Sequence, residues 1–150
     1  MDPKIIVTEN ITLVSLHDVS AGMSHIAGIF EKIADMGVDV NIISISPIQS
    51  DLTSLTFTIN DEDTVKLLQF VKSFSGDVKP VVSSGNYIIS VIDENMENHP
   101  GFASKIFRAL AESDVDVCTI ATSEIQISML VTEADFNSAY ESITNCLNNI

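Results

Sequence analysis

An internal duplication constrains the fold of this 150-residue chain more than any other feature. Residues 29–46, IFEKIADMGVDVNIISIS, align without a gap with residues 106–123, IFRALAESDVDVCTIATS, at an offset of 77 residues. Both segments contain the tripeptide VDV and share a helical spacing of apolar residues. Further on, LTFTINDED (55–63) aligns with ISMLVTEAD (127–135), and the smaller offset places five extra residues in a loop of the first copy. The chain is therefore predicted to contain two copies of one small module.

Each copy predicts the same order of elements. A strand, at roughly 11–16 and 87–92, leads through a polar loop into a helix with one apolar stripe. A strand at 38–46 or 115–122 follows, then a strand of alternating apolar residues and a second helix with an acidic start. The stripes of the first helices comprise Ile26, Ile29, Phe30, Ile33 and Ala34 in one copy and Ala103, Ile106, Phe107, Leu110 and Ala111 in the other.

This order lacks one strand of the ferredoxin-like βαββαβ plan, in which two helices cover one face of an antiparallel four-stranded sheet. Residues 79–85 supply the missing strand for the first copy, whereas the second copy ends at its last helix. A spare strand near the N-terminus can complete it. We therefore predict an α+β fold of two ferredoxin-like modules, at 9–85 and 86–150, with an N-terminal strand at 3–8 joining the second module.

The chain is acidic, with a formal net charge of −14. This charge repels nucleic-acid phosphates and anionic lipid surfaces, so we expect neither nucleic acid nor membrane as a partner. The N-terminus lacks the apolar stretch of a secretory signal, and no apolar run reaches the roughly 18 residues of a membrane span. Cys118 and Cys146 lack metal-ligand spacing and are predicted to be buried, reduced thiols of a cytoplasmic protein.

The loops that open the first helix of each copy are the candidate binding sites. They read SAGMSHI (20–26) and NHPGF (98–102). Backbone N–H groups at a helix start lack intrahelical acceptors and can bind a carboxylate, and Gly22 and Gly101 permit close approach of a ligand. The alternative interpretation is that both loops are simply turns with helix caps.

The segment NHPGFASKIFRALAESDVDV (98–117), followed by IATSEIQISMLV (120–131), resembles the C-terminal regulatory region of aspartokinases. That region contains two ACT domains, small ferredoxin-like modules that bind amino acids. The resemblance extends over nearly the whole chain and implies that the first module is inserted within the second. The kinase domain has no counterpart in this sequence, so the resemblance implies a regulatory, non-catalytic function.

The resemblance also nominates ligand-binding residues. In the family, lysine or threonine binds between modules, at the loop opening the first helix and on the following strand. The matching positions here, together with the TSE segment of the second module, are Met23, Ser24, His25, Ile26, Val40, Asn41, Thr122, Ser123 and Glu124. Lysine-sensitive members can have an aspartate where Asn41 stands, and a neutral amide cannot pair with a buried ammonium group. The first-module site is therefore expected to prefer another amino acid, or to be vestigial.

No enzymatic constellation accompanies these residues. His17, His25 and His99 lack the spacing of a metal site or a hydrolytic triad, and acidic residues gather where helices begin. We expect no catalytic residue, metal or cofactor.

The predicted function is amino-acid sensing that controls an aspartokinase or a related enzyme, in a homodimer or larger oligomer joined through sheet edges. A catalytic aspartokinase chain is a further candidate partner. The alternative is a ligand-free assembly module, and the chain could be a free-standing subunit, a small subunit or a fragment.

Overall fold

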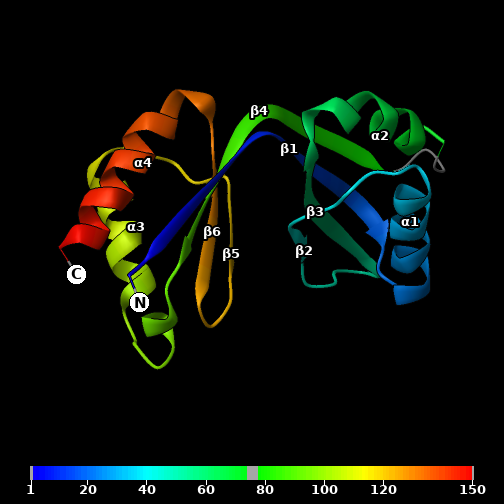
Figure 1. Ribbon diagram of the computed structural model, residues 1–150. Helices are drawn as coiled ribbons and strands as arrows, with labels where there is room; N and C mark the ends of the chain where they lie inside the picture. Colours follow the sequence, from blue (N-terminus) through cyan, green and yellow to red (C-terminus); the bar gives the residue numbers. More distant parts are fainter. Residues whose placement is uncertain (1, 74–77, 150) are drawn as a thin grey trace. The chain divides into compact units, whose positions relative to one another are not determined.

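The computed structural model describes residues 2–73 and 78–149. The described chain contains six strands, four α-helices and two short 3-10 helices (Figure 1). In chain order the elements are β1 (Lys4–Ser20), α1 (Met23–Asp35), β2 (Ile43–Ile45), β3 (Leu52–Asn60), η1 (Asp61–Asp63), α2 (Thr64–Val71), β4 (Lys79–Ile92), η2 (Glu94–Met96), α3 (Phe102–Glu112), β5 (Thr119–Thr122), β6 (Gln126–Val131) and α4 (Glu133–Asn148). The strand order is β2-β3-β1-β4-β6-β5, and the α+β fold is confirmed.

The chain forms two compact units. The first unit is Asn10–Ser84, and the second unit combines Met1–Glu9 with Gly85–Ile150. Strands β1 and β4 each contribute residues to both units, so the strand order is β2-β3-β1-β4 in the first unit and β1-β4-β6-β5 in the second. None of the helices in the described part of the chain is long and apolar enough to span a membrane.

Strands β1 and β4 are longer than the sequence predicts. The pattern indicated separate strands on either side of Asn10 and close to Gly85, but each strand continues through these residues. Asn10 has φ 59° and Gly85 has φ 76°, in the left-handed region that asparagine and glycine tolerate best. These residue types usually mark turns, which explains why the sequence suggested an interruption.

The core of the first unit lies between its sheet and helices α1 and α2. Strands β1 and β3 pair antiparallel, from Ile11 opposite Asn60 to Leu16 opposite Leu55, so alternate side chains share one face. That face and the helices bury Val14, Leu16, Val19, Ile26, Ile29, Ile33, Leu55, Phe57, Ile59, Leu67 and Val71. Ala34, although part of the predicted stripe, is exposed because the buried face of α1 is narrower than the stripe.

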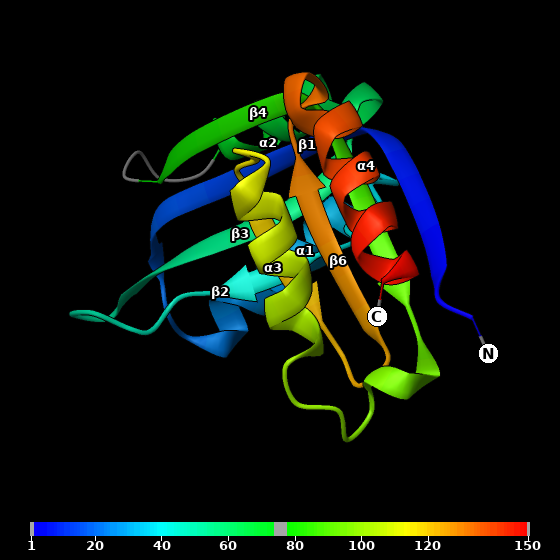
Figure 2. The ribbon, with the colours of Figure 1, turned by 90° about the vertical axis from the view of Figure 1, so that its left-hand side faces the viewer.

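The core of the second unit has the same construction. Helices α3 and α4 pack side by side over strand β6 (Figure 2), and β4 and β5 both pair antiparallel with β6. The buried residues are Ile89, Val91, Phe102, Ile106, Leu110, Val115, Ile127, Met129, Val131, Ala139 and Ile143. Successive helical residues are about 100° apart around the axis. Phe107 and Ala111 of the predicted stripe are therefore turned away from the sheet and exposed.

Candidate functional site

The start of α1 leaves two backbone N–H groups without an acceptor. Gly22 is the N-cap residue and has no side chain to cap the helix. Its carbonyl accepts hydrogen bonds from the N–H groups of His25 and Ile26, at 3.0 and 3.1 Å. Within the described residues, the N–H groups of Met23 and Ser24 donate no hydrogen bond. They are therefore free to bind an anionic group such as a carboxylate.

The side chains of this predicted segment divide into two groups. Met23, Ser24 and His25 are exposed at the first turn of α1, with Met23 67% exposed. Ile26 instead points into the core of the first unit and is 3% exposed. Its side chain therefore stabilises the helix against the sheet, and only the three residues before it are accessible to a ligand.

Val40 and Asn41 lie in the connection that precedes β2. The sequence predicted a strand over 38–46, but β2 has only three residues, Ile43–Ile45. The connection still follows the edge of β3, because the Asn41 N–H donates to the carbonyl of Thr58 at 3.1 Å. Val40 packs partly buried against the core, and the Asn41 side chain is exposed. Asn41 is thus accessible, whereas Val40 presents only part of its surface.

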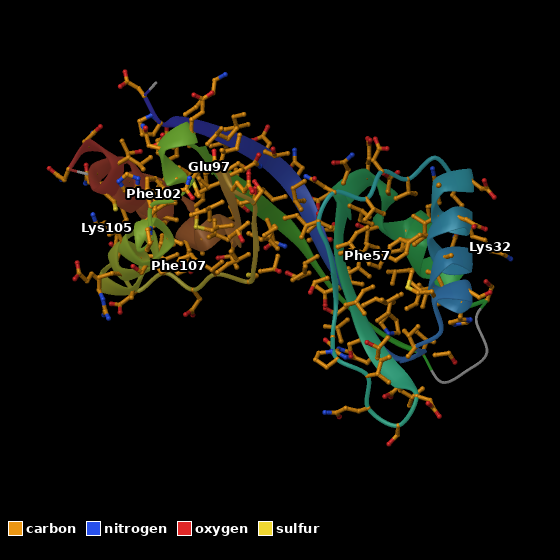
Figure 3. The ribbon with its side chains drawn as sticks, turned by 90° about the horizontal axis from the view of Figure 1, so that it is seen from below. Lys32, Phe57, Glu97, Phe102, Lys105 and Phe107 are labelled. Carbon is orange, nitrogen blue, oxygen red and sulfur yellow. The ribbon has the colours of Figure 1, made fainter. Side chains whose placement is uncertain are left out.

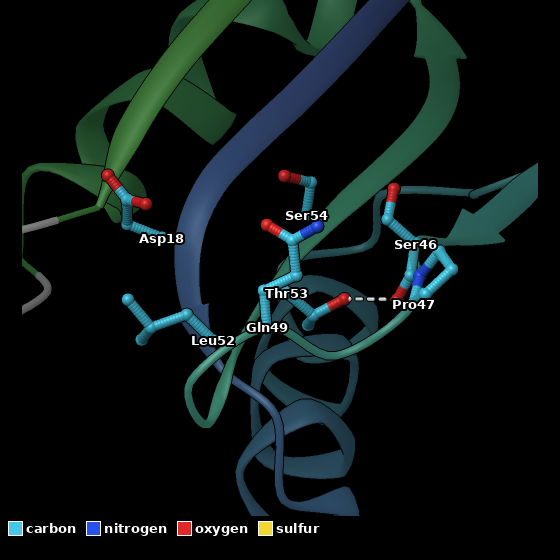
Figure 4. A pocket seen from close by; sticks show the side chains of 7 residues that line it. All are labelled: Asp18, Ser46, Pro47, Gln49, Leu52, Thr53 and Ser54. Carbon is cyan, nitrogen blue, oxygen red and sulfur yellow. Dashed lines mark hydrogen bonds between the residues drawn. The ribbon is translucent and has the colours of Figure 1, made fainter.

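A cavity of about 300 Å³ lies in the first unit beside the loop from β2 to β3 (Figure 4). The Thr53 hydroxyl donates to the Ser46 carbonyl at 2.6 Å and holds the loop against β3. The complete lining is Asp18, Ser46, Pro47, Gln49, Leu52, Thr53 and Ser54, which includes none of the predicted ligand-binding residues. Asp18 has φ 60° at a register shift of β1, an irregularity that no simple apolar pattern reveals.

A second cavity, of about 360 Å³, lies in the second unit and contains three predicted residues. Thr122, Ser123 and Glu124 form its wall at the turn from β5 to β6, which the Ser123 N–H closes by donating to the Gln126 carbonyl at 2.8 Å. Residues of the candidate loop before α3 also line this cavity. The other lining residues are Met96, Glu97, Asn98, His99, Gly101, Phe102, Ala103 and Ile127. The structure thus brings the TSE segment and the NHPGF loop together within one unit.

The start of α3, which lines the second cavity, also has backbone N–H groups without an acceptor, as the start of α1 does. Gly101 is the N-cap residue of α3, with φ 94° and no side-chain cap. Its carbonyl accepts the N–H of Lys105 at 3.2 Å. Across the described residues, the N–H groups of Ala103 and Ser104 donate no hydrogen bond. The positive end of the α3 dipole therefore borders the cavity at Ala103.

The second cavity also contains negative charges, which can bind a cationic group beside the N–H donors of the helix start. Glu97 and Glu124 line it with two exposed carboxylates, and no lysine or arginine does so. Phe102 and Ile127 are buried and form an apolar floor; Figure 3 labels Glu97 and Phe102 on the segment leading into α3. The cavity therefore offers N–H donors for an anion, carboxylates for a cation and an apolar surface between them.

The two cavities are related by the duplication. Ser46 of the first cavity aligns with Ser123 of the second at the offset of 77 residues. At the same offset, Met23 and Ser24 align with Pro100 and Gly101 of the second candidate loop. The sequence could identify these loops. The other residues of the first cavity lie in or beside the loop with the five-residue insertion, except Asp18, which lies in β1.

Neither cysteine has the character of a nucleophile. Cys118 is exposed, contrary to the prediction, and Cys146 is half-buried. Partial burial raises the pKa of the Cys118 thiol, and the neighbouring carboxylates of Asp135 and Asp116 raise it further. Burial also raises the pKa of Cys146, against a smaller lowering by Lys105. Among the described residues, no group of three or more His, Cys, Asp or Glu side chains could hold a metal ion.

Comparison with known proteins finds similarity to ACT domains and to aspartokinases. The family model described as ACT domain matches residues 89–147. Aspartokinase 2 of Bacillus subtilis (strain 168) is 30% identical over 138 residues, which are 90% of this chain and 34% of that protein. The aspartokinase of Geobacillus stearothermophilus is 29% identical over 136 residues, 90% of this chain and 33% of that protein. The chain thus spans about a third of the length of these relatives.

Solved structures show the same fold over most of the chain. The ligand-free regulatory subunit of aspartate kinase from Thermus thermophilus superposes with a TM-score of 0.83 and 16% sequence identity, over 95% of both chains. At this identity the likeness concerns the fold. Together, these comparisons show that residues 89–147 match the ACT domain model and that the chain resembles the regulatory region of aspartokinases.

Proposed function

We propose that this chain is a non-catalytic regulatory domain that binds a small amino acid of the lysine or threonine type. The observation that carries the proposal is the second cavity, whose lining combines the start of α3, where N–H groups lack an acceptor, with two carboxylates. A free amino acid is a zwitterion, so its site must satisfy one negative and one positive group within a few ångströms. The volume of about 360 Å³ lies in the range of small-molecule sites.

Each part of the ligand has a partner in this cavity. The α-carboxylate binds the N–H groups of Ala103 and Ser104 at the start of α3, with the helix dipole in its favour. The α-ammonium group binds Glu97 or Glu124. The aliphatic part lies against Phe102. A threonine-type ligand engages one carboxylate, whereas lysine, with a second ammonium group, can engage both.

The first unit offers a second position for the same type of ligand. Met23, Ser24, His25 and Asn41 are accessible, and the free N–H groups at Met23 and Ser24 suit a carboxylate. The Asn41 amide is neutral, so it favours a hydroxyl or amide side chain over an ammonium group. A threonine-type ligand therefore suits the first unit better than lysine.

Regulation follows if ligand binding favours one of two conformations. A ligand can shift such an equilibrium only by its difference in affinity for the two states. The proposed target is an aspartokinase or a related enzyme of amino-acid metabolism in the cytoplasm, and a catalytic aspartokinase chain is the partner that this target implies. The chain itself contributes sensing and no catalytic residue.

Exposed apolar residues on the outer strands favour a second candidate function, assembly without a ligand. Strands β2 and β5 end the strand order, and Ile43, Ile45 and Ile120 are 51%, 46% and 43% exposed there. An edge strand carries unpaired backbone groups and can pair with another chain. We propose a homodimer or larger homo-oligomer formed through these edges, which either function can use.

Isothermal titration of the full chain against the twenty amino acids separates the two functions. The proposal predicts saturable heat from at least one lysine- or threonine-type ligand. Glu97→Gln and Glu124→Gln should each weaken that binding by at least about threefold, because each removes one exposed charge partner. Glu141→Gln, which changes an exposed carboxylate of α4 outside the cavity, is the matched control. If none of the twenty amino acids gives binding heat while the oligomer stays intact, the result would support the assembly function alone.

A further inference from the structure

A third cavity, of about 600 Å³, lies on the helical side of the second unit and shares only Ser104 with the proposed amino-acid site. It extends along one face of α3, from Ser104 to Glu112, beside the C-terminal end of α4, and the two helices run in opposite directions (Figure 2). Its lining is Ser104, Lys105, Arg108, Ala109, Glu112, Cys146 and Asn149. The positions on α3 are spaced by one helical turn and so share one face.

Both basic residues of the acidic segment 85–150 line this cavity. Lys105 and Arg108 are the two basic residues in the sequence from 85 to 150, which contains ten Asp and Glu. Within residues 2–73 and 78–149, neither forms an ion pair with a carboxylate within 4.0 Å. Two like charges one turn apart on a helix destabilise each other unless an anion compensates them. The carboxylate of Glu112 lies one turn beyond Arg108 and is the single negative group of the lining.

We propose that Lys105 and Arg108 form a binding site for a small dianion of the phosphate-monoester type. A phosphate monoester carries close to two negative charges near neutral pH and presents three acceptor oxygens. The Arg108 guanidinium can bind two of these oxygens as a fork, and the Lys105 ammonium binds as a compact charge. Ser104 lines this cavity and also supplies a backbone N–H group to the proposed amino-acid site. Lys105 and Arg108 take no part in that site and do not line the second cavity, so the dianion proposal does not depend on the amino-acid function.

The competing explanation is purely structural. Basic side chains near the end of a helix stabilise its negative dipole end, and Lys105 and Arg108 lie beside the last turn of α4. That explanation predicts an effect of these residues on stability but no saturable affinity for a dianion. It also predicts no effect of Glu112 on anion binding. The two accounts therefore differ in their response to substitutions of opposite charge sign.

Nuclear magnetic resonance titration of the ¹⁵N-labelled full chain tests the proposal. Inorganic phosphate at pH 7.5 is the probe, with sodium chloride at matched ionic strength as the reference. Saturable shifts are expected for amides of residues 104–109 and 146–149. Lys105→Gln and Arg108→Gln should each weaken phosphate binding by about three- to fivefold, and Glu112→Gln should strengthen it by a similar factor. Lys32→Gln, an exposed lysine of α1 in the first unit, should change nothing.

Either of two results would overturn the proposal. One is a shift that increases linearly with phosphate or matches that of chloride. The other is unchanged phosphate affinity in Glu112→Gln or, where it folds, in the double variant of Lys105 and Arg108. Because Glu112→Gln removes a charge from an exposed position, it is expected to fold, and it keeps the test decisive if a lysine or arginine variant does not.

Discussion

Alanine at the two glycine N-caps of the duplicated helices should have opposite consequences. Gly101 precedes α3 with φ 94°, whereas Gly22 precedes α1 with φ −64° and an extended ψ. A Cβ at Gly101 would meet only the Ser104 hydroxyl at 3.7 Å, and a Cβ at Gly22 would meet nothing within 4 Å. Space is therefore sufficient at both positions, and the difference comes from the backbone alone.

The left-handed conformation costs an L-residue with a Cβ about 1–2 kcal/mol. Gly101→Ala should therefore lower the free energy of unfolding by about that amount, less a smaller opposing gain because alanine restricts the unfolded chain. For a chain of this size, each kcal/mol corresponds to about 2–4 °C in Tm. Gly22→Ala should change stability by less than about 1 kcal/mol, and a small increase is expected because alanine restricts the unfolded state.

Urea unfolding followed by circular dichroism measures both effects. The Gly101→Ala curve should shift to lower urea with an unchanged slope, because the variant loses stability without exposing more surface on unfolding. The Gly22→Ala curve should overlay or exceed that of the parent chain. Equal losses in the two variants would refute the reasoning, because they would show that the cost does not depend on the backbone conformation at the cap.

Three further predictions concern packing, helix propensity and thiol chemistry. Ile106→Ala, at a fully buried position, should cost about 2–5 kcal/mol in urea unfolding, whereas Val65→Ala, at a position 68% exposed, should cost under about 1 kcal/mol. Gly28→Ala inside α1 should add about 0.5–1 kcal/mol, because a Cβ there meets nothing within 4 Å. The raised pKa values of Cys118 and Cys146 mean less thiolate at a given pH. Initial rates with a disulfide reagent should therefore be slower than for glutathione at pH 8 and should increase as the pH approaches 10; faster rates at pH 8 would contradict this.

The duplicated segments were sufficient to predict the fold class and the centre of each buried helix face, but not its edges, where Ala34, Phe107 and Ala111 are exposed. The pairs Ile29 with Ile106 and Ile33 with Leu110 align in the repeat, and all four are buried in their respective cores. These predictions succeeded because core positions obey the helix and strand periods directly. The continuity of β1 and β4 was not predictable, since Asn10 and Gly85 have the composition of turns and adopt left-handed conformations within strands.

The candidate loops were identified from helix-start chemistry, which is local in sequence. The structure brings Thr122, Ser123 and Glu124 together with the loop before α3, a proximity that depends on the turn between β5 and β6. Asp18 and Gln49 of the first cavity were missed, because they lie in an irregular strand and in a loop that has no counterpart in the second copy. Irregular backbone produces no periodic pattern of residues in the sequence, so such positions can be identified only from the structure.

The central claim is that the cavity at the start of α3 binds a free amino acid. A crystal structure of the full chain, grown with the amino acid that gives saturable heat in titration, tests it most directly. The account predicts a ligand with its carboxylate at the N–H groups of Ala103 and Ser104 and an ammonium group within hydrogen-bond distance of Glu97 or Glu124. A ligand bound elsewhere, with this cavity filled only by water, would contradict it.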